Sequence, residues 1–170
     1  MTRLERLQAS LEEPLLVSNP VNVRYLTGFA SSNAALLVEP ERVRLFSDFR
    51  YAEAARTVEG VEFVETKRSL VAALAELLEG NVGFEADAVS HTAWETLKAG
   101  GLALAPRRGL VAALRAVKDE SELHATRRAG EITSEAYARF AEERFVGRTD
   151  RKSTRLNSSH LTQPRMPSSA

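Results

Sequence analysis

Hydrophobic positions in the first 118 residues alternate between the spacing of helices and the spacing of strands. Leucines at helical intervals after Thr2 predict an amphipathic opening helix, with the Thr2 side chain as its cap. Short apolar runs that end at turn residues predict strands. These runs place strands at residues 14–18, 34–38, 42–46, 61–66, 81–84 and 102–105. Helical spacing places helices at residues 4–11, 21–26, 51–57, 70–78, 91–98 and 109–115.

This alternation of strands and short helices is typical of an α/β fold, in which a mostly parallel sheet carries helices on its faces. The strands at 34–38 and 42–46 are separated only by Glu39-Pro40-Glu41, and so short a connection favours a hairpin. We therefore predict a mixed, mostly parallel sheet with flanking helices. Asp48 and Ser90 precede two of the predicted helices and are expected to cap them.

After Lys118 the pattern becomes that of one long helix. Asp119 followed by Glu122 is typical of a capping box at a helix start. The apolar residues that follow share one helical face. They are Ala125, Ala129, Ile132, Ala136 and Phe140. The helix predicted from them runs for about 25 residues, which is longer than most helices of globular domains and favours a connector to a further domain.

Residues 151–170 differ in character from the rest of the chain. They contain four basic residues, five serines and no acidic residue, and they show no apolar period. Such a segment cannot bury enough surface to offset the entropy lost on ordering. We expect it to be a disordered tail of foreign origin, and the chain to be a fragment of a larger protein.

Charge and composition narrow the possible functions. The chain has 23 basic and 23 acidic residues, and because four basic ones lie in 151–170, residues 1–150 are mildly acidic. An acidic body lacks the clustered Lys and Arg that nucleic-acid binding needs. No apolar run approaches the ~20 residues that span a bilayer, and the N-terminus lacks the apolar core of a secretory signal. With no cysteine available for disulfides, a cytoplasmic protein that binds neither nucleic acid nor membrane is expected.

The residues show no complete catalytic or metal-binding motif. The histidines lie in three separate regions, without the i, i+4 pairing of a zinc site. They are His91, His124 and His160. Neither a Gly-rich phosphate loop nor a GxSxG nucleophile motif is present. Asp48, Glu85 and Asp87 would suit a two-metal nuclease cluster, but helix caps and turns are the commoner role for such carboxylates.

Two groups of segments resemble the N-terminal domain that Xaa-Pro aminopeptidases and prolidases share with creatinase. In the first group, residues 22–29 (NVRYLTGF), 31–38 (SSNAALLV) and 45–51 (LFSDFRY) follow one another in the family's order. In the second, residues 114–123 (LRAVKDESEL) are similar to the family's link into its catalytic domain. The resemblance extends over residues 14–147. It is specific because two separate groups of segments occur in the order that the family has.

The resemblance implies a fold and a domain organisation. Residues 1–117 would form an RNase-H-like α/β domain without nuclease activity, and residues 118–150 a linking helix and the start of a pita-bread metallopeptidase domain. Residues 151–170 would be the disordered, non-native tail. In the family, two divalent ions (commonly manganese, cobalt or zinc) are held in the catalytic domain by two Asp, one His and two Glu. Those ligands have no counterpart here, so the fragment alone is expected to hold no cofactor and to be inactive.

The resemblance also implies partners and site residues. In this family the N-terminal domain contributes to homo-oligomer contacts and to the walls of an active site that takes proline-containing peptides. A role in substrate access is therefore implied for five residues, Tyr25, Phe29, Asp48, Arg50 and Tyr51. Their structural alternatives are core aromatics, a helix cap and a local ion pair. Two other functions stay open: a fragment of a creatinase-like amidinohydrolase or of a non-catalytic binding protein, and an unrelated α/β binding module.

Overall fold

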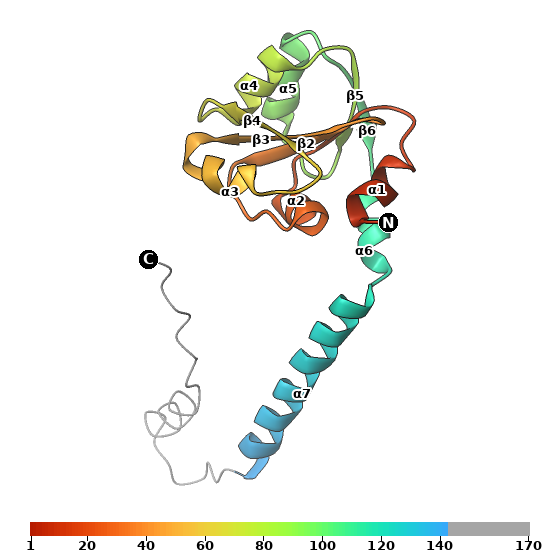
Figure 1. Cartoon of the computed structure of the whole chain (residues 1–170), viewed down its shortest axis with the longest axis vertical. Helices are drawn as coiled ribbons and strands as arrows, with labels where there is room; N and C mark the ends of the chain where they lie inside the picture. The colour runs from red at the N-terminus through yellow and green to blue at the C-terminus, as the bar shows by residue number, and fades with distance from the viewer. Residues whose placement is uncertain (143–170) are drawn as a thin grey trace. The chain divides into compact units, whose positions relative to one another are not determined.

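A six-stranded mixed sheet forms the centre of residues 1–118, the first of two units into which the chain divides (Figure 1). The computed structural model describes residues 1–142. The strands of the sheet are β1 (Leu15–Val17), β2 (Ala34–Val38), β3 (Val43–Asp48), β4 (Glu62–Thr66), β5 (Asn81–Glu85) and β6 (Ala103–Arg107). The first unit also contains α1 (Arg3–Gln8), α2 (Pro20–Thr27), the 3-10 turn η1 (Phe49–Tyr51), α3 (Ala52–Arg56), α4 (Leu70–Leu77), α5 (His91–Ala99) and α6 (Leu110–Ala116).

The strand order is β4-β3-β2-β1-β5-β6. The β2–β3 hairpin is antiparallel, as the short connection at Glu39 predicts, and β1 also pairs antiparallel with β2. The other three pairs, β3–β4, β1–β5 and β5–β6, are parallel. The predicted mixed, mostly parallel sheet with flanking helices is therefore confirmed.

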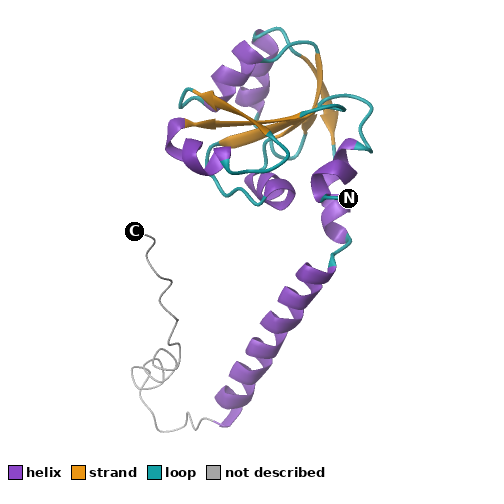
Figure 2. Ribbon diagram, viewed as in Figure 1, coloured by secondary structure: helices purple, strands orange, loops and turns teal. Residues whose placement is uncertain are grey.

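Both faces of the sheet are covered by helices (Figure 2). Side chains alternate along β2, so that Leu36 packs with α1, α2, α3 and α6 on one face, whereas Leu37 packs with α4 and α5 on the other. All five residues of β2 are buried. Because a strand covered on both faces can carry apolar residues at every position, β2 reads as a continuous hydrophobic run.

Local sequence signals set the helix ends. Thr2 and Glu5 form a capping box at the start of α1, and the Ser90 hydroxyl accepts a hydrogen bond from an α5 amide. Asn19 caps α2, which ends at Gly28 with a φ of 75°, a conformation that glycine adopts without steric cost. The caps predicted at Thr2 and Ser90 are confirmed.

Most predicted element boundaries shift by a few residues, and two of the differences have a clear local cause. The helix predicted at 51–57 is divided into η1 and α3, because the Asp48 side chain caps the chain earlier, at Arg50. The strand predicted at 102–105 continues to Arg107 through Pro106. Proline is tolerated there because β6 is an edge strand, where one side needs no N–H donor.

The second unit begins at Asp119, and within the described residues it consists of α7 (Glu120–Glu142). The predicted capping box is confirmed, since the Glu122 amide donates to Asp119 Oδ1 and the Asp119 amide donates to Glu122 Oε2. The predicted apolar stripe is exposed: Ile132 has 53% of its surface accessible and Phe140 has 49%. The role of α7 as a connector remains a prediction. The expectations for 151–170 lie outside the described residues.

No helix within residues 1–142 is long and apolar enough to cross a membrane.

One close helix contact gives a stability prediction. Gly100 follows α5 and faces α4, where an added Cβ would lie against the Ala75 carbonyl oxygen and 2.9 Å from the Ala75 Cβ. The Gly100→Ala variant should therefore lose about 1–3 kcal/mol of unfolding free energy, since a packed contact has no room for another methyl group. Urea denaturation measures this loss.

Gly130, in the middle of α7, is the matched control, because nothing lies within 4 Å of an added Cβ there. The Gly130→Ala variant should not lower stability, since alanine is favoured over glycine inside a helix by about 1 kcal/mol. Equal denaturation curves for Gly100→Ala and the parent chain would contradict the close contact.

Candidate functional site

Four of the five residues predicted to serve substrate access lie together at the carboxyl end of β3. Asp48 ends β3, and Arg50 and Tyr51 belong to the 3-10 turn η1 that follows. The Phe29 ring meets the Tyr51 ring edge-on at 6.3 Å between centroids. The loop before β2 adds Ser32 and Asn33. We call Phe29, Ser32, Asn33, Asp48, Arg50 and Tyr51 the β3-end cluster.

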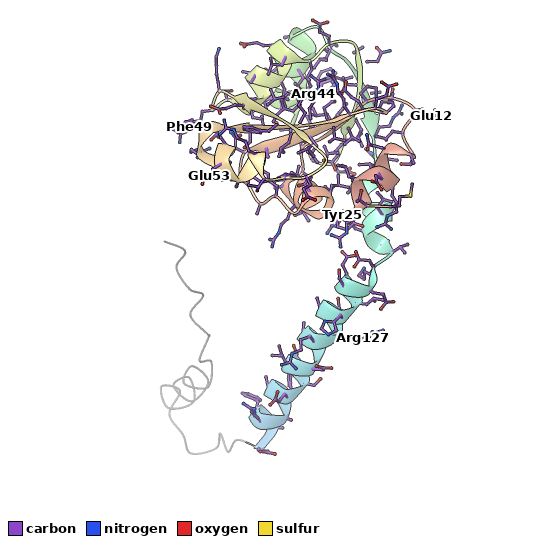
Figure 3. All side chains as sticks on the ribbon, in the orientation of Figure 1. Glu12, Tyr25, Arg44, Phe49, Glu53 and Arg127 are labelled. Carbon is purple, nitrogen blue, oxygen red and sulfur yellow. The ribbon has the colours of Figure 1, made fainter. Side chains whose placement is uncertain are left out.

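Tyr25, the fifth predicted residue, lies in a different environment. It is buried on α2, and its hydroxyl donates to the Leu114 carbonyl in α6 at 3.1 Å. The Arg3 guanidinium lies 4.5 Å from the ring centroid. Figure 3 shows Tyr25 and Phe49, a neighbour of Asp48 and Arg50, in separate parts of the first unit. Tyr25 therefore helps to attach α1 and α6 to α2.

Asp48 organises the β3-end cluster. Its side chain has no exposed surface, and its carboxylate accepts hydrogen bonds from three sources. The Arg50 amide donates to Oδ1 at 3.0 Å, which caps η1. The Arg50 guanidinium donates through Nε at 2.9 Å and through Nη2 at 2.7 Å, a two-pronged ion pair. Asn33 Nδ2 donates to Oδ2 at 2.5 Å and also to the Arg68 carbonyl at 3.1 Å, which ties the β4–α4 loop to β3.

These contacts determine the protonation state of the cluster. The hydrogen bond from Arg50 holds the pKa of Asp48 well below its usual range; burial opposes this effect, and the Asn33 hydrogen bond reinforces it. The same pair raises the pKa of Arg50. The Ser32 hydroxyl lies 2.8 Å from the Tyr51 hydroxyl, and this hydrogen bond lowers the pKa of Tyr51. Asp48 and Arg50 are therefore both ionised at neutral pH.

The ion pair orients Arg50 without using all of its donors. Asp48 takes the Nε edge of the guanidinium, and the Tyr51 ring lies 5.3 Å from its central carbon. The other edge of the guanidinium, formed by Nη1 and the second Nη2 hydrogen, is not used by Asp48. The Arg50 side chain is 38% exposed, so a ligand can reach this edge. That edge has the geometry to bind a second carboxylate with two hydrogen bonds. Phe49 beside it is 67% exposed and supplies an apolar surface.

Ser32, Asn33 and Phe49 were not among the predicted site residues. The polar run 31–33 marks a loop before β2, but nothing local to it indicates that Asn33 reaches Asp48, 15 positions away.

Phe29 also lines a groove of about 840 Å³ between α1 and the ends of α2 and α3. No lysine, arginine or histidine lines this groove, and Glu5 and Glu59 do.

The described residues do not fit a metal centre. No group of three His, Asp or Glu side chains that could hold an ion occurs within residues 1–142. Asp48 and Glu85, two members of the nuclease alternative, end strands β3 and β5, which are separated in the sheet by β2 and β1. Asp48 is also occupied by Arg50 and Asn33. The nuclease alternative therefore has no support in this part of the chain.

The lowered pKa of Asp48 predicts how stability depends on pH. The carboxylate stabilises the folded state fully above the ordinary Asp pKa of about 3.9, and this contribution is lost as the pH falls below that value toward the lower folded pKa. The Asp48→Asn variant should therefore be less stable than the parent chain at neutral pH, and the difference should shrink below about pH 4. Thermal unfolding across this range measures it.

Glu41, an exposed carboxylate in the β2–β3 turn, provides the control. The Glu41→Gln variant should follow the parent chain at every pH, because no buried ion pair is lost. A deficit of Asp48→Asn that stays constant down to the lowest pH would mean that ionisation of Asp48 contributes nothing to stability.

Comparisons with known proteins agree with this fold. Residues 3–117 match the family model described as the Creatinase/Prolidase N-terminal domain. The uncharacterized peptidase YqhT of Bacillus subtilis is 29% identical over 147 residues, which cover 79% of this chain and 41% of that protein. The N-terminal domain of the cytoplasmic peptidase PepQ from Mycobacterium tuberculosis is 31% identical, with a TM-score of 0.59, over 66% of this chain and 97% of that structure.

A longer solved structure shows the same fold at lower identity. The Xaa-Pro dipeptidase from Bacillus anthracis is 24% identical with a TM-score of 0.74, over 81% of this chain and 41% of that one. The chain thus spans about two fifths of the length of its longer relatives. The match to the family model covers more than half of the sequence and includes every strand of the sheet. The chain belongs to the creatinase/prolidase N-terminal domain family.

Proposed function

We propose that this chain is the N-terminal, non-catalytic part of a proline-specific metallopeptidase, either an Xaa-Pro aminopeptidase or an Xaa-Pro dipeptidase. The family match over residues 3–117 carries this proposal. It is supported by the names of similar proteins, which include a putative Xaa-Pro aminopeptidase of Mycoplasma pneumoniae and an Xaa-Pro aminopeptidase of Streptococcus pyogenes. The family description also includes creatinase, so a creatinase-like amidinohydrolase is the alternative.

The bond-breaking chemistry of such a protein would lie outside residues 1–142. A two-metal hydrolase needs several converging carboxylates and an imidazole, and the described residues do not provide them. The parent protein would hold two divalent ions, manganese, cobalt or zinc. A similar structure from Corynebacterium diphtheriae bears the name of a putative metallopeptidase, in support of this part of the proposal.

The β3-end cluster would serve substrate access in the assembled enzyme. The free edge of Arg50 is suited to a peptide carboxylate, and Phe49 offers an apolar surface to a proline ring. Asp48 and Asn33 would position Arg50 and would not touch the substrate. We also propose that copies of the parent protein contact one another through this domain. The parent protein would be located in the cytoplasm. The similarity to the cytoplasmic peptidase PepQ of Mycobacterium tuberculosis supports the cytoplasmic location.

The first test is hydrolysis by the chain alone. Incubated with manganese, cobalt or zinc and an Xaa-Pro dipeptide or tripeptide, the purified chain should release no more product than the metal by itself, because the catalytic ligands are absent from residues 1–142. Chromatographic detection of the released N-terminal amino acid measures this for both substrates. Release above the metal blank that a chelator abolishes would overturn the assignment of a non-catalytic role.

A second test concerns Arg50 in a protein that joins this chain to the metal domain of a relative. Replacing Arg50 by lysine keeps a cation beside Asp48 but removes the planar fork. The Arg50→Lys variant should lower kcat/KM for Xaa-Pro peptides by about tenfold with little change in melting temperature. Steady-state kinetics and thermal unfolding separate the two effects.

Arg56→Lys is the control for this experiment. Arg56 also pairs with a carboxylate, Glu65 at 3.1 Å, and lies over an aromatic ring, that of Phe63, yet it is 62% exposed on α3 and outside the β3-end cluster. The substitution should leave kcat/KM unchanged. If Arg50→Lys lowers the melting temperature while the rate stays at the parent value, Arg50 serves the fold and not the substrate.

A further inference from the structure

A second polar site, composed of other residues, lies at the carboxyl ends of β1 and β5. It surrounds a cavity of about 170 Å³ in the first unit. Charged side chains of both signs, Glu85 and Asp87 with Arg107 and Arg115, line the cavity. We propose that this cavity binds a small α-amino acid in its zwitterionic form. The inference does not rest on the proposed peptidase function, because it concerns binding to residues of this chain alone.

The position of the cavity follows from the order of the strands. β1, β5 and β6 are parallel, so their carboxyl ends lie at one edge of the sheet. In the sheet, β1 lies between β2 and β5. The chain continues from β1 to β2 on one side of β1, and β5 and β6 lie on its other side. Such a reversal of direction leaves a crevice beyond the strand ends, and this is where open α/β sheets bind ligands. Glu85 ends β5 and Arg107 ends β6.

A hydrogen-bond network holds the walls of the cavity in place. The Glu85 carboxylate accepts hydrogen bonds from the amides of Ser18 at 2.9 Å and Asn19 at 2.8 Å, and from Asn22 Nδ2 at 2.5 Å. Asn22 is 8% exposed, and its Oδ1 accepts a hydrogen bond from Arg115 Nη1 at 3.2 Å. These bonds join β1, α2, β5 and α6. The cavity is therefore preformed, which limits the entropy lost on binding.

The network leaves groups of both signs available to a ligand. The hydrogen bond to Asn22 uses one of the five N–H donors of Arg115, and other N–H groups of this guanidinium can bind a carboxylate. Glu85 Oε1 accepts one hydrogen bond, and Asp87, at 74% exposure, lies 3.9 Å from Arg108. An ammonium and a carboxylate on one small molecule match these groups.

The size of the cavity selects the ligand class. A volume of about 170 Å³ lies below the range of about 300–1,000 Å³ for pockets that hold drug-sized ligands. Leu15, Leu110 and Val111 supply apolar walls. A single amino acid with a small apolar side chain therefore fits the cavity.

Titration of the whole chain with glycine, L-alanine and L-proline, followed by amide NMR chemical shifts, tests the proposal. At least one of these amino acids should bind saturably, with shifts at the ends of β1 and β5 and the start of α6. The N-acetyl derivative, which lacks the ammonium, and the methyl ester, which lacks the carboxylate, should each bind at least tenfold more weakly. Binding that survives both modifications, or shifts that grow linearly without saturation, would overturn the proposal.

Substitutions assign the binding to the cavity. The Arg115→Gln variant should weaken binding at least tenfold, and Asp87→Asn should weaken it less, because Asp87 lies at the exposed rim. Arg56→Gln is the matched control, since Arg56 also carries an exposed guanidinium but pairs with Glu65 and does not line the cavity. Circular dichroism verifies that each variant is folded. Equal affinity of the parent chain and Arg115→Gln would place any bound amino acid elsewhere and contradict the proposal.

Discussion

The constraint on which the structure depends is that its central sheet is covered on both faces. Helices cover each side, so the middle of every inner strand is surrounded by apolar side chains. A charged group there would lose its hydration without a partner. In the central strands β1, β2 and β5, polar residues therefore occur only at the strand ends, where loops and helix termini supply hydrogen bonds. Asp48, Thr66, Glu85 and Arg107 end β3, β4, β5 and β6, respectively.

Two of these terminal carboxylates are stabilised in different ways. Asp48 is neutralised by a guanidinium only two residues away, so the charge and its partner belong to one turn. Glu85 is held by amides of Ser18 and Asn19 and by the Asn22 side chain, all from a distant part of the sequence. The first arrangement shapes a surface turn with an oriented arginine. The second joins separate segments around a cavity.

Sequence reasoning succeeded where a few neighbouring residues decide the structure. Thr2, Ser90 and the Glu39 turn act within their own helix or hairpin, so their roles could be read from local pattern. The family resemblance grouped Tyr25, Phe29, Asp48, Arg50 and Tyr51; the structure brings all but Tyr25 together, and their role in substrate access stays a prediction. Asn33 was missed because its partner is 15 positions away, and the Asn22 and Arg115 pair because 93 positions separate them. Such pairings depend on how the sheet closes, which periodicity does not specify.

The mixed pairing of the sheet also bears on the order in which the chain folds. Antiparallel β2 and β3 are neighbours in sequence, so this hairpin closes a short loop at small entropic cost. β1 and β5 pair through Leu15 and Gly83, 68 positions apart, and this long loop closes late and slowly. During synthesis, the backbone groups of β1 that pair with β5 would therefore stay unpaired until β5 has been made. Until then, that open edge is a site for pairing with a foreign strand.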